Sequence, residues 1–222
     1  FQCGCRACEV SCLANVNQNI FRAYDIRGIY GKDITEKTAE LVGKAFGTFI
    51  GRGKKIAVAR DVRISGEKLK KNLILGLISV GCDVEDIGFV TTPMMYFAVS
   101  SRNLDGGIIV TASHNPAEWN GFKLTREKGI MVSQGFGMEE IKDIVLEEKF
   151  NKVDAIGKIS QVNIVEDYKK FILSKINGSS KKLKIVLDPG NGSACFIAED
   201  LLKNAGHNVV TINGNPDGTF PS

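Results

Sequence analysis

Segments typical of strands and segments typical of helices alternate along this chain from about Ile20 onward. Apolar residues recur at helical spacing through Glu36–Ile50, and Gly51 follows at the point where a helix would end. Residues 107–111 are instead apolar and β-branched, which is typical of a central strand. Further strands are expected near 55–59, 83–87 and 121–125, and further helices near 65–80, 92–98 and 137–148. This alternation predicts an α/β fold, a layered α/β/α domain with a mainly parallel or mixed sheet.

A second unit follows this first one. Periodicity is lost over residues 150–161, which we therefore expect to connect two domains, one over 20–150 and one over 151–222. The second domain has a similar βα build, and its expected elements are helices over 165–176 and 194–204, a buried strand over 183–187, a sharp turn over 188–193 and a strand over 208–212. About 60 residues give only a marginal core. We therefore expect this second domain to be incomplete.

Cysteine is concentrated at the start of the chain. Residues 1–19 carry four of the six cysteines, namely Cys3, Cys5, Cys8 and Cys12. Their spacing matches neither the paired CxxC motifs of zinc sites nor the ferredoxin motifs closely. Two interpretations stay open: a non-native or disordered leader, such as translated upstream sequence, or a zinc or iron–sulfur module. Cys82 and Cys195 lie far apart in apolar surroundings and are expected to be buried free thiols, which suits a cytoplasmic protein.

Charge and hydropathy limit the classes of partner. The net charge of +4, from 29 basic and 25 acidic residues, suits a small anionic ligand such as a sugar phosphate. The basic residues are scattered and form no block interleaved with aromatic residues, so we expect no nucleic-acid partner. No apolar run approaches the ~20 residues that a membrane-spanning helix needs, so we expect no membrane partner.

The most informative stretch follows the strand at 107–111, and it reads Thr111-Ala-Ser-His-Asn-Pro116. A serine at the carboxyl end of a sheet strand lies where ligands bind in open α/β folds. Asn115 and Pro116 favour a tight turn that would expose Ser113 at a loop tip. An ordinary strand-to-loop turn would share these features. A hydrolase triad is disfavoured, because adjacent residues such as Ser113 and His114 rarely face each other and the Gly-x-Ser-x-Gly motif is absent.

Five stretches in order resemble motifs of the α-D-phosphohexomutases. They are Phe21-Arg-Ala-Tyr-Asp-Ile-Arg-Gly28, Ala59-Arg-Asp-Val-Arg63 with Ser65, residues 88–93 with Thr-Thr-Pro, Thr111–Pro116 with Asn120-Gly-Phe-Lys123, and Asp188-Pro-Gly-Asn-Gly192. The resemblance covers everything from Ile20 to Ser222. The Tyr-Asp-Ile-Arg-Gly form resembles the phosphomannomutase/phosphoglucomutase branch, whereas phosphoglucosamine mutases usually carry Gly-Thr-Asp-Gly-Ile-Arg-Gly.

The resemblance implies a role for each matching site residue. Ser113 would be the phosphoserine, which transfers its phosphoryl group to a hexose monophosphate and recovers the other phosphate from the bisphosphate intermediate. Arg27 would contact this phosphate, and Lys123 would be the general acid/base. His114 and Asn115 would support the loop and bind phosphate or substrate through hydrogen bonds.

Neighbouring motifs are interpreted as structural. We interpret Arg60, Asp61 and Arg63 as a charge network that braces the serine loop. Asn191 and Gly192 are expected to shape a strand-to-helix turn. Ser65 is expected to be the N-cap of the helix that follows it.

The implied metal is Mg²⁺, one per active site, held by an oxygen of the Ser113 phosphate and by three aspartates of an Asp-Gly-Asp-Gly-Asp loop. This sequence contains no such loop. The resemblance therefore implies an N-terminal fragment with negligible activity of its own, from an enzyme that interconverts hexose 1-phosphates and hexose 6-phosphates of mannose, glucose or both. Its partners would be hexose phosphates and hexose 1,6-bisphosphate. Phosphoglucosamine mutase and a non-catalytic sugar-phosphate-binding protein stay open as alternatives.

Overall fold

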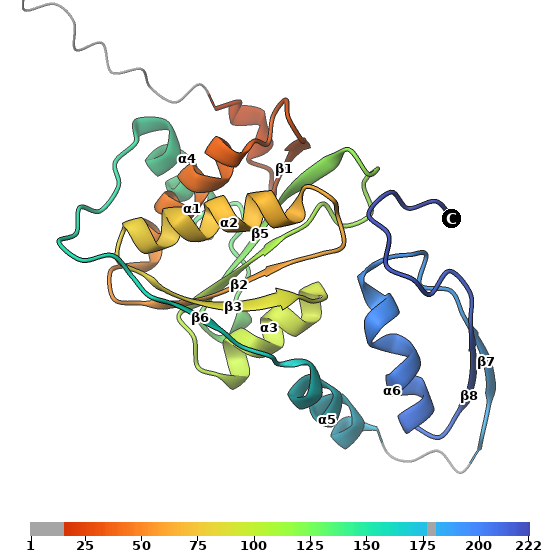
Figure 1. The fold of residues 1–222 in the computed structure, drawn as a ribbon. Coiled ribbons are helices and arrows are strands. Elements are labelled where there is room, and N and C mark those ends of the chain that lie inside the picture. The colour runs from red at the N-terminus through yellow and green to blue at the C-terminus, as the bar shows by residue number, and fades with distance from the viewer. Residues whose placement is uncertain (1–15, 177–180) are drawn as a thin grey trace, which may run out of the picture.

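The structure is a computed structural model that describes residues 16–176 and 181–222. The cysteine-rich leader at 1–19 lies mostly outside the described residues, so its two interpretations stay open. Where the chain is described, it forms a six-stranded sheet covered by helices on both faces, followed by a small two-stranded unit (Figure 1). The α/β fold predicted from the sequence is confirmed.

The large sheet is mixed. Its strands are β1 (Ile26–Ile29), β2 (Lys55–Arg60), β3 (Asp83–Phe89), β4 (Gly106–Val110), β5 (Trp119–Arg126) and β6 (Ile159–Gln161). They lie in the order β1-β5-β4-β2-β3-β6. β2 pairs in parallel with β3 and β4, and β3 pairs in parallel with β6, whereas β5 is antiparallel to both β1 and β4. The antiparallel part carries the candidate site.

Helices cover the two faces in separate groups. They are α1 (Glu36–Ile50), α2 (Gly66–Ser79), α3 (Thr92–Ser101), α4 (Met138–Glu147), α5 (Val165–Lys175) and α6 (Ala198–Asn204). In Figure 1, α1, α2 and α4 lie on one side of the sheet and α3 lies on the other. Two buried apolar clusters correspond to these two faces. The molecule therefore has three layers.

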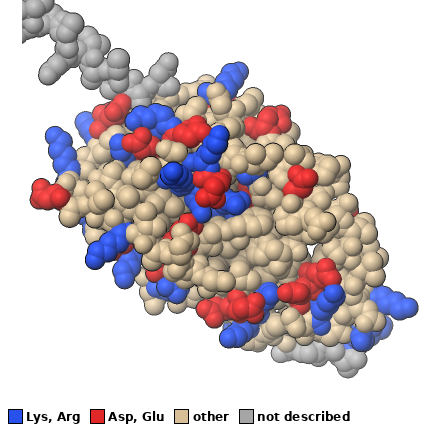
Figure 2. Space-filling model, in the orientation of Figure 1, with Lys and Arg blue, Asp and Glu red and all other residues tan. Residues whose placement is uncertain are grey.

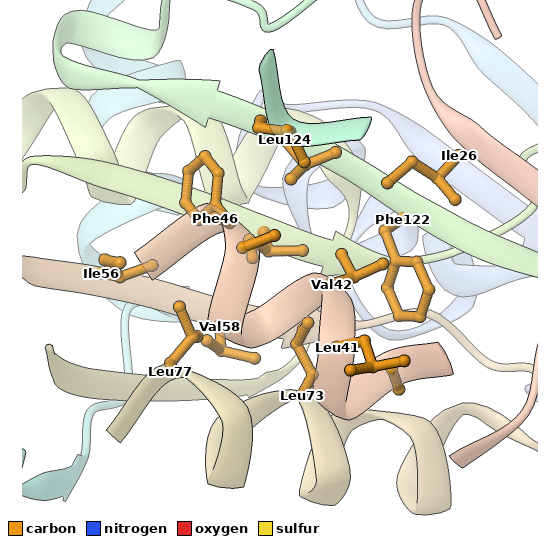
Figure 3. Packing of buried hydrophobic residues seen from close by; sticks show 14 of the residues in the cluster. Ile26, Leu41, Val42, Phe46, Ile56, Val58, Leu73, Leu77, Phe122 and Leu124 are labelled. Atoms are coloured by element: carbon orange, nitrogen blue, oxygen red, sulfur yellow. The ribbon is translucent and has the colours of Figure 1, made fainter. Parts of the chain in front are cut away.

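Strand β2 shows why the sheet is buried on both sides. Its alternate residues point to opposite faces. Ile56 and Val58 belong to the cluster under α1 and α2, whereas Ala57 and Ala59 belong to the cluster under α3. Figure 3 shows Ile56 and Val58 packed with residues of α1, α2, β1 and β5, including Phe46 of α1. A strand of this kind reads as a continuous apolar run, which is why the sequence predicted it.

Two glycines let α1 and α2 approach each other closely. A Cβ atom on Gly43 would lie 2.3 Å from the carbonyl oxygen of Leu73, and one on Gly76 would lie 2.1 Å from that of Glu40. Real side chains do not tolerate such contacts, so both positions need glycine. The close approach holds the two helices as one layer over the sheet.

The connection expected over 150–161 includes a strand of the first sheet. β6 pairs in parallel with β3, with Val84 opposite Ile159. The side chain of Gln161 also donates to Asp86 at 3.1 Å. This segment therefore extends the edge of the sheet before the chain enters α5.

The second unit is less buried than the sequence suggested. Its strands, β7 (Lys184–Leu187) and β8 (Asn208–Thr211), pair in parallel. The strand over 183–187 was expected to be buried, but Val186 is 71% exposed and Val210 66% exposed. α6 contacts β8, and only alternate residues of the two strands are shielded, so one face of this small sheet stays open to solvent.

Two further expectations for this unit are wrong. The helix expected over 194–204 is divided into a 3-10 turn, Ser193–Phe196, and α6, with Ile197 at φ −133° between them. Ile197 is buried in the cluster under α3, so a contact with the first unit interrupts the helix. Cys82 is a buried free thiol as expected, whereas Cys195 is half-buried.

Candidate functional site

The serine loop begins where β4 ends. Ser113 is exposed and has a φ of 56°, in the left-handed region that non-glycine residues rarely adopt. Its backbone N–H donates to the Thr111 hydroxyl at 3.0 Å, and the N–H of Asn115 donates to the carbonyl of Ala112 at 3.1 Å. Such a conformation persists only where the surroundings hold it. The loop therefore presents the Ser113 hydroxyl to solvent in a fixed position.

Arg63 is the group that holds this loop. Its side chain is 1% exposed, and its two terminal nitrogens donate to four backbone carbonyls. Nη1 bonds those of Pro116 at 2.7 Å and Trp119 at 2.8 Å, and Nη2 bonds those of Ser113 at 3.1 Å and Asn115 at 2.6 Å. A planar guanidinium suits such a fork, whereas a lysine cannot reproduce it. Burial lowers the pKa of Arg63, and the charge of Asp61 opposes this effect.

Asp61 links Arg63 to the start of the loop. It accepts from the Thr111 hydroxyl at 2.6 Å and from the backbone N–H of Arg63 at 3.0 Å. Burial raises the pKa of Asp61, while the Thr111 hydrogen bond and Arg63 act against it. The bracing network predicted from the sequence is confirmed for Asp61 and Arg63. Arg60 joins this network through the backbone, because its Nη1 donates to the carbonyl of Asp61 at 3.0 Å, while its Nε pairs with Glu67 at 2.7 Å.

Arg27 and Lys123 lie on one face of the sheet. Arg27 on β1 is opposite Gly121 on β5, and Lys123 is two residues further along β5. Residues two apart share a face, so both side chains project from the same side. β5 is an interior strand, which lies between β1 and β4. Gly121 is needed at this crossing, because a Cβ atom there would lie 2.0 Å from the carbonyl oxygen of Ile26.

Asp25 connects these two cations, and no role was predicted for it from the sequence. It is 7% exposed and forms an ion pair with Arg27, and its carboxylate lies 3.7 Å from the Lys123 ammonium. Arg27 also donates to the side chain of Asn115 at 2.5 Å, which joins the cluster to the serine loop. The position of Asp25 inside the Tyr24–Gly28 motif was the available signal. We call Asp25, Arg27 and Lys123 the cation cluster.

His114 contacts the serine directly. Its Nδ1 lies 3.3 Å from the Ser113 hydroxyl, and both side chains are exposed. This contact differs from the expectation that these adjacent residues do not face each other. The left-handed conformation of Ser113 accounts for the difference, because it turns the serine side chain away from its usual direction.

Asn120 fastens the second motif to the start of α2. It donates to the Ser65 hydroxyl at 2.7 Å, and its carbonyl oxygen accepts from the backbone N–H of Gly121 at 2.8 Å. Ser65 was expected to cap α2, but its side chain makes no capping hydrogen bond. A buried asparagine is costly unless its polar atoms are paired. Pairing with Asn120 therefore takes the place of the cap.

Two hollows flank Ser113. One has a volume of about 270 Å³ and is lined by hydroxyl side chains of Thr91, Thr92, Thr111 and Ser193. The other has a volume of about 590 Å³ and is lined by Arg63 and Asn115 among others. Small-molecule sites usually have volumes of about 300–1,000 Å³. The loop tip is therefore accessible from two sides.

Metal ligands are scarce in the described part of the chain. It contains no group of three His, Cys, Asp or Glu side chains that could hold an ion. The carboxylates of Asp61 and Asp25 are engaged by arginine side chains. These residues do not fit a Mg²⁺ site by themselves, because Mg²⁺ prefers several oxygen ligands in octahedral geometry.

The outer surface is mixed in charge. On the face drawn in Figure 2, basic and acidic side chains of the described residues lie interspersed in small groups. Within 16–176 and 181–222, every helix is too short or too polar to cross a membrane.

Comparison with known proteins identifies the fold. A family model described as phosphoglucomutase/phosphomannomutase, alpha/beta/alpha domain I, matches residues 18–152. The chain belongs to this family. The matched residues of this phosphoglucomutase/phosphomannomutase domain contain the serine loop, Arg63 and the whole cation cluster. The family resemblance found in the sequence is thereby confirmed.

Relatives of this phosphoglucomutase/phosphomannomutase chain are longer. A phosphoglucosamine mutase of Caldicellulosiruptor bescii is 40% identical over 209 residues, which cover 90% of this chain and 46% of that protein. A phosphomannomutase/phosphoglucomutase of Pseudomonas aeruginosa is 39% identical over 209 residues, which cover 92% of this chain and 43% of that protein. The crystal structure of a phosphoglucomutase/phosphomannomutase family protein from Burkholderia thailandensis is similar, with a TM-score of 0.87 and 36% identity. The match covers 93% of this chain and 46% of that chain. The chain thus spans less than half the length of these relatives.

Proposed function

We propose that this chain is the N-terminal part of a phosphohexomutase that interconverts hexose 1-phosphates and hexose 6-phosphates through a phosphoserine at Ser113. One observation carries the proposal. Arg63 binds four carbonyls of a loop whose exposed serine is kept in a left-handed conformation. The cation cluster beside this loop and the names of the relatives support the same function.

The transfer requires little covalent chemistry from the protein. In the first half of the reaction, the bond between phosphorus and the Ser113 oxygen breaks as a bond between phosphorus and a sugar hydroxyl oxygen forms, and in the second half a phosphorus–oxygen bond to the sugar breaks as the bond to Ser113 forms again. Lys123 takes the proton of that hydroxyl. The bisphosphate then reorients, and its other phosphate returns to Ser113 as Lys123 gives the proton back. Catalysis of such a transfer depends mainly on positioning and charge stabilisation.

The cation cluster suits a phosphorylated serine. Phosphoserine carries a charge of about −1.5 to −2 at neutral pH. Once Lys123 has taken the hydroxyl proton, Arg27 and Lys123 carry two positive charges, and Asp25 offsets one of them. The cluster would therefore face the phosphate with about one unit of net positive charge. Asp25 also fixes the directions of both cations, so it would serve as a positioning residue.

Mg²⁺ is part of the proposal with a limited role for this chain. When bound, the ion would offset charge on the transferring phosphoryl group. Within the described residues, Ser113 would contribute one ligand through its phosphate, and the remaining ligands would come from outside them.

The substrate class rests on the sequence motifs. We propose mannose and glucose phosphates, because the Tyr24–Gly28 motif resembles that branch of the family. Phosphoglucosamine mutase is the second candidate, because a relative at 40% identity has this name. A non-catalytic sugar-phosphate-binding protein is a third, although such a protein has no need of a phosphoryl carrier. A cytoplasmic location is part of the proposal, since hexose phosphates are its substrates.

The experiment has two parts. The full-length protein is incubated with glucose 1,6-bisphosphate, and phosphopeptides are mapped by mass spectrometry. We expect phosphate on Ser113 and none in the Ser113→Ala variant, and phosphate confined to another serine would refute the assignment. The 222-residue chain is then assayed with mannose, glucose and glucosamine phosphates, Mg²⁺ and the matching bisphosphate. We expect negligible turnover, and robust turnover would show that the chain is sufficient on its own.

A further inference from the structure

Phe220 lies against the arginine that holds the serine loop. Its ring centroid is 5.1 Å from the guanidinium carbon of Arg63. Phe220 also lines both hollows beside Ser113. It belongs to the second unit, some 150 residues along the chain from Arg63. Figure 1 shows the C-terminal tail running from the second unit toward the first.

The turn that carries Phe220 is tightly built. Asp217 accepts from the backbone N–H of Thr219 at 2.8 Å and from its hydroxyl at 2.7 Å, and its carbonyl accepts from the N–H of Phe220 at 3.1 Å. Phe220 has a φ of 50°, which such a closed turn can impose. The backbone at Phe220 is therefore fixed by the turn, which we call the Phe220 turn (residues 217–220).

The Phe220 turn packs on the backbone next to Arg63. Gly218 is buried, and a Cβ atom on it would lie 2.7 Å from the carbonyl oxygen of Val62 and 2.8 Å from the backbone nitrogen of Ile64. Only a glycine allows this approach. The turn thus contacts the residues on both sides of Arg63 in the sequence.

A second tether joins the same two regions. The N–H of Val62 donates to the Ser193 hydroxyl at 3.2 Å, across 131 positions of the chain. Asn191 binds the tail, since its side chain donates to the carbonyl of Asn215 at 2.9 Å and its carbonyl accepts from the N–H of Asp217 at 2.8 Å. The 191–193 turn and the Phe220 turn therefore dock on residues 62–64 together.

We propose that the Phe220 turn is a brace that holds the Ser113 loop in position from the second unit, with Phe220 as a positioning residue for phosphoryl transfer. The relevance to catalysis rests on the proposed function, whereas the brace itself is a property of the fold. The ring covers one face of the Arg63 guanidinium and keeps water from the hydrogen bonds that this group makes. An aromatic face also attracts the cation, most strongly where water is excluded.

The test compares substitutions of Phe220 by amide hydrogen exchange in the 222-residue chain. Phe220→Leu keeps apolar volume and removes the aromatic face. We expect exchange at Ser113, Asn115 and Trp119 to become roughly 3- to 30-fold faster, in proportion to the lost cation–π interaction. Phe220→Tyr keeps the ring and should exchange like the unsubstituted chain. Equal exchange in Phe220→Leu, or equal acceleration in both variants, would overturn the proposal.

Two further variants make the result specific. Phe171→Leu removes a ring that lies 5.4 Å from the ammonium of Lys175, away from the loop, and should leave exchange in the loop unchanged. Gly218→Ala should accelerate exchange as Phe220→Leu does, because its Cβ atom pushes the turn off residues 62–64. If Phe220→Leu does not fold, Gly218→Ala decides the question on its own.

A second readout separates the brace from the proposed function. Full-length protein with Phe220→Leu is treated with glucose 1,6-bisphosphate, and the rate of phosphate transfer to Ser113 is followed by intact mass. We expect this rate to fall roughly 3- to 30-fold with Phe220→Leu and to recover with Phe220→Tyr. Phosphorylation of the unsubstituted protein with no effect of Phe220→Leu on either readout would refute the brace. Altered exchange with no phosphorylation of any variant would refute the proposed function and leave the brace standing.

Discussion

Replacing Arg63 by lysine tests the central structural claim about the site. Arg63 donates from two separate nitrogens to four carbonyls of residues 113–119, and its side chain is 1% exposed. A lysine ammonium is a single point charge and cannot occupy both positions. We therefore expect Arg63→Lys to leave two of the four carbonyls without their donor.

The cost follows from the type of bond lost. A hydrogen bond from a charged donor contributes about 1.5–3 kcal/mol, so two lost bonds lower the free energy of unfolding by about 3–6 kcal/mol. Domains of this size are stable by about 5–15 kcal/mol. The variant should therefore fold but be strongly destabilised.

The assay is urea unfolding followed by tryptophan fluorescence. The chain has one tryptophan, Trp119, and its carbonyl is one of the four acceptors of Arg63, so the probe reports on the loop itself. Arg102→Lys is the matched control, because Arg102 makes its ion pair with Glu85 at a more exposed position. It should cost about 0–1 kcal/mol. A loss in Arg63→Lys that is no larger than in the control would refute the reasoning.

Three more predictions concern the packing and the buried groups. Gly76→Ala places a Cβ atom 2.1 Å from the carbonyl oxygen of Glu40, so α1 and α2 must move apart. The free energy of unfolding should fall by about 1–3 kcal/mol, and an unchanged value would contradict this prediction. Burial raises the pKa of Asp86, but hydrogen bonds, first among them the one from Lys70, outweigh burial and lower this pKa overall. The ion pair therefore contributes fully to stability above the unfolded-state pKa of about 4, and this contribution is lost as the pH falls below that value. The free energy of unfolding should accordingly depend less on pH in this acid range in Asp86→Asn. Burial raises the pKa of Cys82 from 9.0 to about 11, which reduces the fraction of thiolate about 100-fold near pH 8. Iodoacetamide should therefore label the Cys82 peptide only when the chain unfolds, and rapid labelling of the folded chain would contradict this.

The sequence predicted elements that carry their own local pattern. α1 begins and ends where the periodicity predicted, because its apolar face and its terminal glycine are both visible in the sequence. β6 was missed, because its three residues are all exposed and only pairing with β3 makes them a strand. The break at Ile197 was missed for a similar reason, since a contact with the other unit causes it.

The residues of the candidate site also divide into those that local motifs predicted and those that only the folded structure brings together. The motifs indicated Ser113, Arg27 and Lys123 one at a time. The bracing role of Arg63 was predicted from its place in the Ala59–Arg63 motif. The shared partner Asp25 and the ring of Phe220 depend on which segments meet in space. The Tyr24–Gly28 motif could have indicated Asp25 as a site residue, but which groups Asp25 and Phe220 contact follows only from strand pairing and packing.

The antiparallel pairing of β1 with β5 also sets the order of events during synthesis. Arg27 and Asn115, which meet at the serine loop, are 88 positions apart, and within the described sheet β1 pairs with β5 alone. At ~5–20 residues per second, a ribosome needs roughly 4–18 s to make that stretch. Until β5 has been made, β1 lacks the strand with which it pairs in the folded sheet. The candidate site therefore cannot form until β5 has been synthesised and pairs with β1.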